Sequence, residues 1–157
     1  MDDQCVTASV QIDAAPDVVY GLITDLPTLA SLAEEAVAME WRRGDALRPG
    51  AVFVGHNENG KRRWSTKCTV TDAEPGRVFA FDVRHTVFPI ARWQYDIAAA
   101  EGGCRVTEST WDRRPGWFRK LAGAATGVTD RVAANTEHIQ LTLQRLKQRA
   151  EAGSPTP

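Results

Sequence analysis

One carboxylate of this sequence stands where a strand pattern would bury it. Val106, Glu108 and Thr110 alternate with polar residues and therefore share one face of a predicted strand. Burial disfavours the charged form of a carboxyl, so Glu108 is the candidate acid or base of the chain. The structural alternative is that Glu108 lies near an end of the sheet, or pairs with an arginine such as Arg92 or Arg105.

Two polar side chains interrupt an otherwise apolar helical stripe near the C-terminus. Asn135 and Thr136 fall between Val132 and Ile139 in a pattern with the helical period. Buried polar side chains need hydrogen-bond partners, which a ligand, a water molecule or the sheet would supply. Asn57, on a predicted inward strand face, is a similar case. We predict ligand contacts for Asn57, Asn135 and Thr136.

Aromatic side chains recur on the predicted inward faces of three strands. Such side chains line apolar ligand sites, where the indole N–H and the phenol O–H offer polar contacts, but they also fill plain cores. His85 has the inward phase and lies next to a predicted bend. The predicted ligand-binding residues of these strands are Trp64, Thr66, Phe79, Phe81, His85, Trp93 and Tyr95.

The motifs for other chemistries are missing from the sequence. It has no P-loop, no GxGxxG and no nucleophile elbow. Its histidines and cysteines lack metal-ligand spacing. They are His56, His85, His138, Cys5, Cys68 and Cys104. We therefore predict no metal and no cofactor, and we expect the cysteines to be reduced thiols.

The composition is that of an ordinary globular chain close to neutrality. The 157 residues are 43% hydrophobic and 25% charged, with a formal net charge of -1. This balance argues against nucleic-acid binding, which calls for a basic face. The acidic start is no secretory signal, and no apolar run could span a bilayer. We expect a cytoplasmic protein, either a monomer or a homodimer.

The predicted elements follow a simple order. Alternation predicts a first strand, proline-marked segments predict two short helices after it, and a meander of further strands separated by turns comes next. A helix is then predicted from about Trp117 to Ala150, with a bend or close packing at Gly123 and Gly127. Residues 3–150 would form a single domain and 151–157 a disordered tail. The strands are expected at 5–12, 37–43, 51–57, 63–71, 78–85, 91–98 and 104–111.

Short motifs spread over residues 6–147 carry a resemblance to a known family. They are Ala15-Pro16-Asp17-Val18-Val19-Tyr20, Glu40-Trp41, Pro49-Gly50, Gly55-His56-Asn57, Glu74-Pro75-Gly76-Arg77, Trp93-Gln94-Tyr95 and the run from Gly102 to Ser109. In this order the chain resembles the SRPBCC superfamily, with its START-like helix-grip fold, and more narrowly its polyketide cyclase/dehydrase-like branch. The resemblance implies an α+β fold in which a curved antiparallel sheet of about seven strands wraps around one long C-terminal helix. It also implies a hydrophobic cavity that binds a small molecule.

Three functions are compatible with this resemblance. The first is binding of a small hydrophobic or aromatic ligand, polyketide-like or lipid-like, between the sheet and the long helix. The second is a polyketide cyclase or dehydratase that uses Glu108 as acid or base, with Tyr95 or Asn135 orienting an oxygen. The third is a protein–protein interaction module that uses the edge or outer face of the sheet. The sequence offers no paired acid and base, which favours binding.

Overall fold

One antiparallel sheet forms the frame of the molecule. The computed structural model describes residues 4–43, 48–126 and 130–153. In this part of the chain seven strands pair in the order β1-β7-β6-β5-β4-β3-β2. Consecutive strands from β2 to β7 therefore lie side by side, and β1 pairs with β7 at one edge of the sheet. The strands are β1 (Gln4–Ile12), β2 (Ala36–Arg43), β3 (Val52–Asn59), β4 (Arg62–Glu74), β5 (Val78–His85), β6 (Phe88–Ala100) and β7 (Gly103–Asp112).

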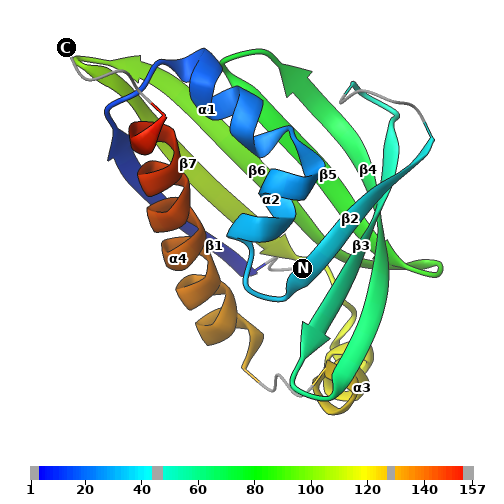
Figure 1. Cartoon of the computed structure of the whole chain (residues 1–157). Coiled ribbons are helices and arrows are strands. Elements are labelled where there is room, and N and C mark those ends of the chain that lie inside the picture. The colour runs from blue at the N-terminus through cyan, green and yellow to red at the C-terminus, as the bar shows by residue number, and fades with distance from the viewer. Residues whose placement is uncertain (1–3, 44–47, 127–129, 154–157) are drawn as a thin grey trace.

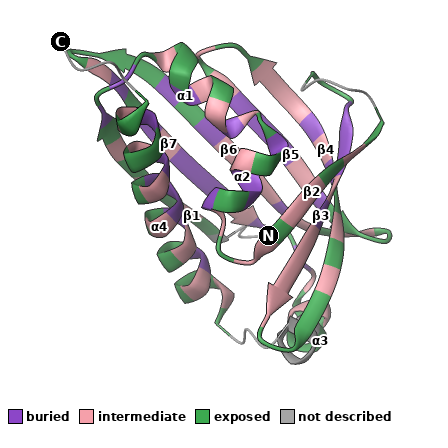
Figure 2. Ribbon diagram, in the orientation of Figure 1, coloured by how far each residue is buried: buried purple, intermediate pink, exposed green. Residues whose placement is uncertain are grey.

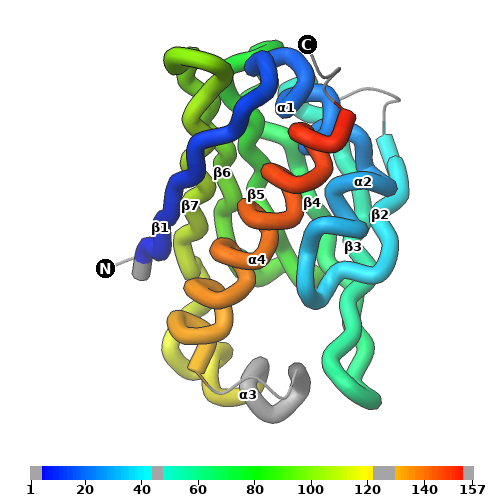
Figure 3. Tube along the Cα trace, turned by 60° about the vertical axis from the view of Figure 1, so that its left-hand side comes forward, coloured from blue at the N-terminus to red at the C-terminus, as the bar shows by residue number. Residues whose placement is uncertain are grey.

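The helices lie on the concave side and at one end of this curved sheet. They are α1 (Pro16–Ile23), α2 (Leu26–Leu32), α3 (Gly116–Thr126) and α4 (Arg131–Ala152). The sheet curves around α4, and α1 and α2 cover the same face (Figure 1). Turned by 60°, the molecule shows α3 at the end where α4 begins (Figure 3). This is the helix-grip arrangement that the resemblance implies.

Local sequence signals explain where the helices start. Proline is tolerated in a first helical turn because its missing N–H has no partner there in any case. Pro16 opens α1 in this way, and Pro27 follows the N-cap of α2. The N-cap itself, Asp25, accepts a hydrogen bond from the backbone of Thr28 at 3.2 Å. Asp130 caps α4 in the same manner, at 3.0 Å from the backbone N of Ala133.

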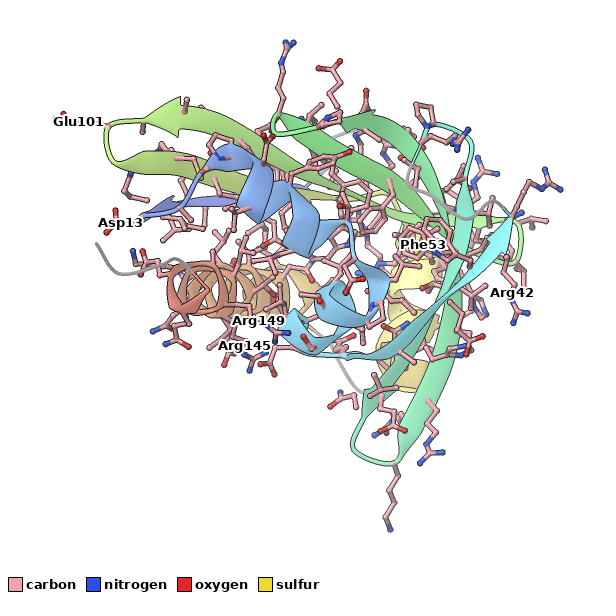
Figure 4. The ribbon with its side chains drawn as sticks, turned by 45° about the horizontal axis from the view of Figure 1, so that its top comes forward. Asp13, Arg42, Phe53, Glu101, Arg145 and Arg149 are labelled. Atoms are coloured by element: carbon pink, nitrogen blue, oxygen red, sulfur yellow. The ribbon has the colours of Figure 1, made fainter. Side chains whose placement is uncertain are left out.

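The apolar core occupies only one end of the space between α4 and the sheet. Ile139, Leu143 and Leu146 of α4 are buried against the sheet, and buried residues line the strand faces toward the helices (Figure 2). With the top of the molecule turned forward, Phe53 lies inside and Arg42 points outward (Figure 4). The C-terminal half of α4 therefore supplies the packing that holds the helix to the sheet.

The predicted single helix from Trp117 to Ala150 is wrong, because the chain forms two helices there. α3 ends at Thr126 and α4 starts at Arg131, after the Asp130 cap. Gly127 lies outside the described residues. An aspartate N-cap satisfies backbone N–H groups that a continuous helix would have bonded internally, so it marks a new start.

The predicted tail also begins too early. Glu151 and Ala152 belong to α4, and the Glu151 carboxylate accepts hydrogen bonds from the backbone of Asp13 at 3.0 Å and from Lys147 at 2.5 Å. Residues 154–157 lie outside the described part of the chain. None of the described helices is long and apolar enough to cross a membrane.

Replacing Leu146 with alanine tests the role of α4. Leu146 is fully buried, so Leu146→Ala should lower the free energy of unfolding by about 2–5 kcal/mol, as large-to-small core changes do. The exposed residue Gln144 on the same helix provides the control, since Gln144→Ala should change the free energy of unfolding by less than about 0.5 kcal/mol. Urea unfolding measures both. Equal, small effects would mean that α4 does not hold the fold together.

Candidate functional site

A cavity of about 370 Å³ lies beside the core, between the concave face of the sheet and the helices α2, α3 and α4. Strands β2 to β7 contribute to its wall, and the wall is mainly apolar and aromatic. The helix α4 covers it with Arg131, Asn135, His138 and Thr142. One end of the sheet–helix space is thus packed and the other is hollow, at a volume typical of small-molecule sites.

A second depression, of about 280 Å³, lies over strands β5 to β7. Charged side chains border it, including Glu74, Arg77, Asp96 and Arg105. These side chains are exposed. Small-molecule sites are mostly apolar and bury most of the ligand, so the cavity under α4 is the better candidate.

The cavity brings together most of the residues that the sequence singled out. Asn57, Trp64, Thr66, Phe81, His85, Trp93, Tyr95, Glu108 and Asn135 all line it. They come from β3 to β7 and from α4, so residues from position 57 to position 135 meet in one wall. Strand alternation predicted the inward phase of the strand residues, and the helical period predicted that of Asn135.

Two of the predicted ligand residues do not line the cavity. Phe79 is fully buried and packs in the core, with its ring centroid 5.3 Å from that of Phe81 and 6.3 Å from that of Tyr95. Thr136 is exposed, and its hydroxyl donates to the backbone oxygen of Val132 at 2.8 Å. Successive helical residues are turned by about 100°, so Thr136 points away when its neighbour Asn135 faces the cavity.

Among the described residues, Glu108 is the one carboxyl that is buried without a cationic partner. It is 1% exposed, and its Oε2 atom has no hydrogen-bond partner among the described residues. Burial raises the pKa of Glu108 to about 8, and a hydrogen bond with Tyr95 acts weakly in the opposite direction. At pH 7 the carboxyl is therefore mainly neutral. Burial and the neighbouring carboxyl also raise the pKa of Tyr95 well above its usual value.

Neither arginine considered as a partner for Glu108 pairs with it. Arg92 instead bonds Asp72 at 2.9 Å and lies 3.4 Å from Asp82, while Arg105 is exposed. Side chains alternate between the two faces of a strand, so Arg92 and Arg105 lie on the face opposite to Glu108. The alternation that turns Glu108 toward the interior therefore turns these two arginines toward the outer face of the sheet.

The cavity wall contains a buried ion pair that was not predicted from the sequence. Arg114 and Asp112 are 8% and 4% exposed, and the guanidinium grips both carboxylate oxygens, at 2.7 and 2.9 Å. Burial alone raises the pKa of Asp112, but the hydrogen bonds from Arg114 and the charges of Arg114 and Arg119 lower it overall. Asp112 therefore stays ionised, but it is a weak base, because its pKa is lowered and both its oxygens already accept hydrogen bonds from Arg114.

A second ion pair connects α4 to the segment before β2. Arg131 donates to Glu35 at 2.8 Å, and His138 lies 3.8 Å from the same carboxylate oxygen. All three line the cavity. Sequence periodicity could not reveal this pair, because its members lie 96 positions apart and meet only when α4 folds over the sheet.

The side of the cavity next to α3 reaches solvent. Leu121 lines the cavity and is 63% exposed. Phe118 also lines it and packs against Phe88, with ring centroids 5.2 Å apart. Trp117 beside it is 55% exposed. These apolar side chains form the solvent-facing border of the cavity. No group of three or more potential metal ligands occurs among the described residues.

Comparisons with known proteins agree with this architecture. Residues 3–151 match the family model described as polyketide cyclase / dehydrase and lipid transport. The chain belongs to this family. A search of curated protein sequences finds no match. The family's description covers both cyclase chemistry and carriage of lipids, so membership leaves the activity to be argued from the site.

Solved structures show the same fold. The Polyketide_cyc-like protein Cgl2372 from Corynebacterium glutamicum is 26% identical, with a TM-score of 0.64 over 96% of this chain and 93% of that chain. Protein CV1439 from Chromobacterium violaceum is 14% identical, with a TM-score of 0.72 over 96% and 99%. The di-domain ARO/CYC StfQ from the steffimycin biosynthetic pathway is 11% identical, with a TM-score of 0.73 over 94% of this chain and 51% of StfQ.

The buried carboxyl should make stability depend on pH. Between about pH 5 and pH 8 folded Glu108 keeps a proton that the unfolded chain has released, because its pKa is raised from 4.5 to about 8. The free energy of unfolding should therefore fall as pH rises through this window, by up to about 1.4 kcal/mol per pH unit from this group.

Glu108→Gln removes this contribution, and urea unfolding at several pH values measures it. The exposed Glu101 provides the control, since Glu101→Gln should keep the slope of the unaltered protein. If Glu108→Gln and the unaltered protein had parallel profiles, the carboxyl would titrate normally in the folded state.

Proposed function

We propose that this protein binds a small, largely apolar or aromatic ligand, polyketide-like or lipid-like, in the cavity under α4. The observation that supports this most directly is the cavity itself. Its volume of about 370 Å³ and its apolar wall with a few convergent polar groups have the character of a ligand site. Membership of the polyketide cyclase / dehydrase and lipid transport family is consistent with such a ligand.

The chemistry of the wall favours binding over catalysis. A dehydratase needs an acid for the leaving hydroxyl and a base for the carbon-bound proton. Glu108 has the protonation state of an acid, but Asp112 is held ionised by Arg114 at 2.7 Å and Glu35 is engaged by Arg131 at 2.8 Å. Neither carboxylate is positioned as a free base.

A dye-binding experiment tests the proposed function. The uncharged dye phenylnaphthylamine fluoresces in apolar surroundings and should bind at one site per chain. Ala91 lines the cavity from β6, so Ala91→Phe fills part of the space and should weaken binding at least roughly tenfold, or about 1.4 kcal/mol.

The control for this variant lies on the same strand. Ala98 is exposed and does not line the cavity under α4. Ala98→Phe should leave the affinity unchanged. Thermal unfolding checks that both variants are folded. Saturable binding with the same affinity in Ala91→Phe as in the unaltered protein would place the dye outside the cavity and contradict the proposal.

A cyclase or dehydratase activity is the second candidate, and the neutral carboxyl of Glu108 beside Tyr95 supports it. Glu108→Gln separates the two functions, because it keeps the shape and removes the acid. For an enzyme, the variant should bind dye as before while product formation from a β-keto polyketide mimic is lost. For a carrier, neither protein forms product. Liquid chromatography with mass detection measures the product.

A further inference from the structure

The polar groups in the cavity wall fall into two kinds. In the charged pairs each carboxylate is neutralised by an arginine: Arg114 forms an ion pair with Asp112 at 2.7 Å, and Arg131 forms one with Glu35 at 2.8 Å. Glu108 differs from both, because burial and the Tyr95 hydrogen bond are the only influences on its titration. Its Oε2 atom has no hydrogen-bond partner among the described residues.

In the described part of the chain, no cation forms an ion pair with Glu108 or influences its pKa. The titratable or charged side chains that share the cavity wall come from β4 to β7, from α4 and from the segment before β2. They are Cys68 of β4, His85 of β5, Tyr95 of β6, Asp112 and the adjoining Arg114 of β7, Arg131 and His138 of α4, and Glu34 and Glu35 before β2. The histidines are engaged elsewhere: His85 bonds the backbone oxygen of Ser65 at 3.0 Å, and His138 faces Glu35.

We propose that Glu108 is the polar anchor of the cavity and selects uncharged ligands that carry a carbonyl oxygen. This inference rests on the proposed ligand-binding function and names the class of ligand. A neutral carboxyl has one O–H donor, and a buried donor without an acceptor costs about 1–3 kcal/mol. A carbonyl oxygen supplies the missing acceptor and brings neither a charge nor a further donor into the apolar wall.

The other ligand classes fit this wall less well. A hydrocarbon leaves the Glu108 donor without a partner. A carboxylate brings a second acidic group next to Glu108, while Arg114 and Arg131 already serve Asp112 and Glu35. An amine would take the proton from Glu108, and the resulting buried ion pair would have to recover the desolvation of two charges. A ketone carries none of these costs.

Four naphthalenes substituted at the same ring carbon test the selection. Acetylnaphthalene and isopropylnaphthalene have nearly the same shape and differ in the carbonyl group. Naphthoate adds a negative charge, and naphthylethylamine a positive one. Calorimetry or displacement of the bound dye gives each affinity in the full-length protein at pH 6.5, where Glu108 is protonated because its pKa is about 8.

Acetylnaphthalene should bind most tightly, about tenfold better than isopropylnaphthalene, which corresponds to a hydrogen bond of about 1.4 kcal/mol. Glu108→Leu should abolish this ratio while isopropylnaphthalene still binds, which also shows that the variant folds. Glu108→Gln keeps an N–H donor and should keep most of the ratio. Glu101→Leu, the same change at an exposed glutamate outside the cavity wall, should leave the ratio unchanged.

The pH dependence gives a second readout. Above a pH of about 8 Glu108 loses its proton, so the preference for acetylnaphthalene should disappear in the unaltered protein and persist in Glu108→Gln. An equal ratio in Glu108→Leu and the unaltered protein, or tighter binding of naphthoate or naphthylethylamine, would overturn the inference and leave the proposed function standing. If none of the four compounds bound, the proposed function itself would fail.

Discussion

The carboxyl of Glu108 lies on the inward face of β7 between Val106 and Thr110, and α4 covers that side of the sheet. Taking a carboxyl out of water is costly unless it is neutral or paired with a cation. In the described part of the chain no ion pair reaches Glu108, so its proton stays in place at neutral pH. The cavity wall is therefore uncharged at Glu108. The neutral carboxyl offers one O–H donor in mainly apolar surroundings.

The cavity exists because α4 uses its two halves differently. The part of the helix from Ile139 onward packs Ile139, Leu143 and Leu146 against the sheet, which secures the helix. Its N-terminal half stands over open space, where the pair of Arg131 and Glu35 ties it to the segment before β2. A helix packed along its whole length would have filled that space, and a helix without the buried half would not have stayed on the sheet.

Strand alternation predicted most of this architecture and part of the cavity wall. Period-two patterns are local, so the inward phase of Trp93, Tyr95 and Glu108 could be read from neighbouring residues. The same alternation along β7 also predicts that Asp112 faces inward, although Asp112 was not among the predicted site residues. Arg114 follows the end of β7, where alternation no longer applies, and only its fold back onto Asp112 buries it. The separation of α3 from α4 was obscured because apolar positions continue across it, although Asp130 is a typical N-cap.

The protonation state of Glu108 is the central claim of this account. Carbon-13 NMR of the side-chain carboxyl, assigned by comparison with Glu108→Gln, follows its titration directly in the folded protein. The Glu108 resonance should titrate with a pKa of about 8, because the carboxyl is buried, and it should stay in the protonated position at pH 6. A titration in the ordinary glutamate range, near 4.5, would show that water or a cation reaches the carboxyl and would contradict the account.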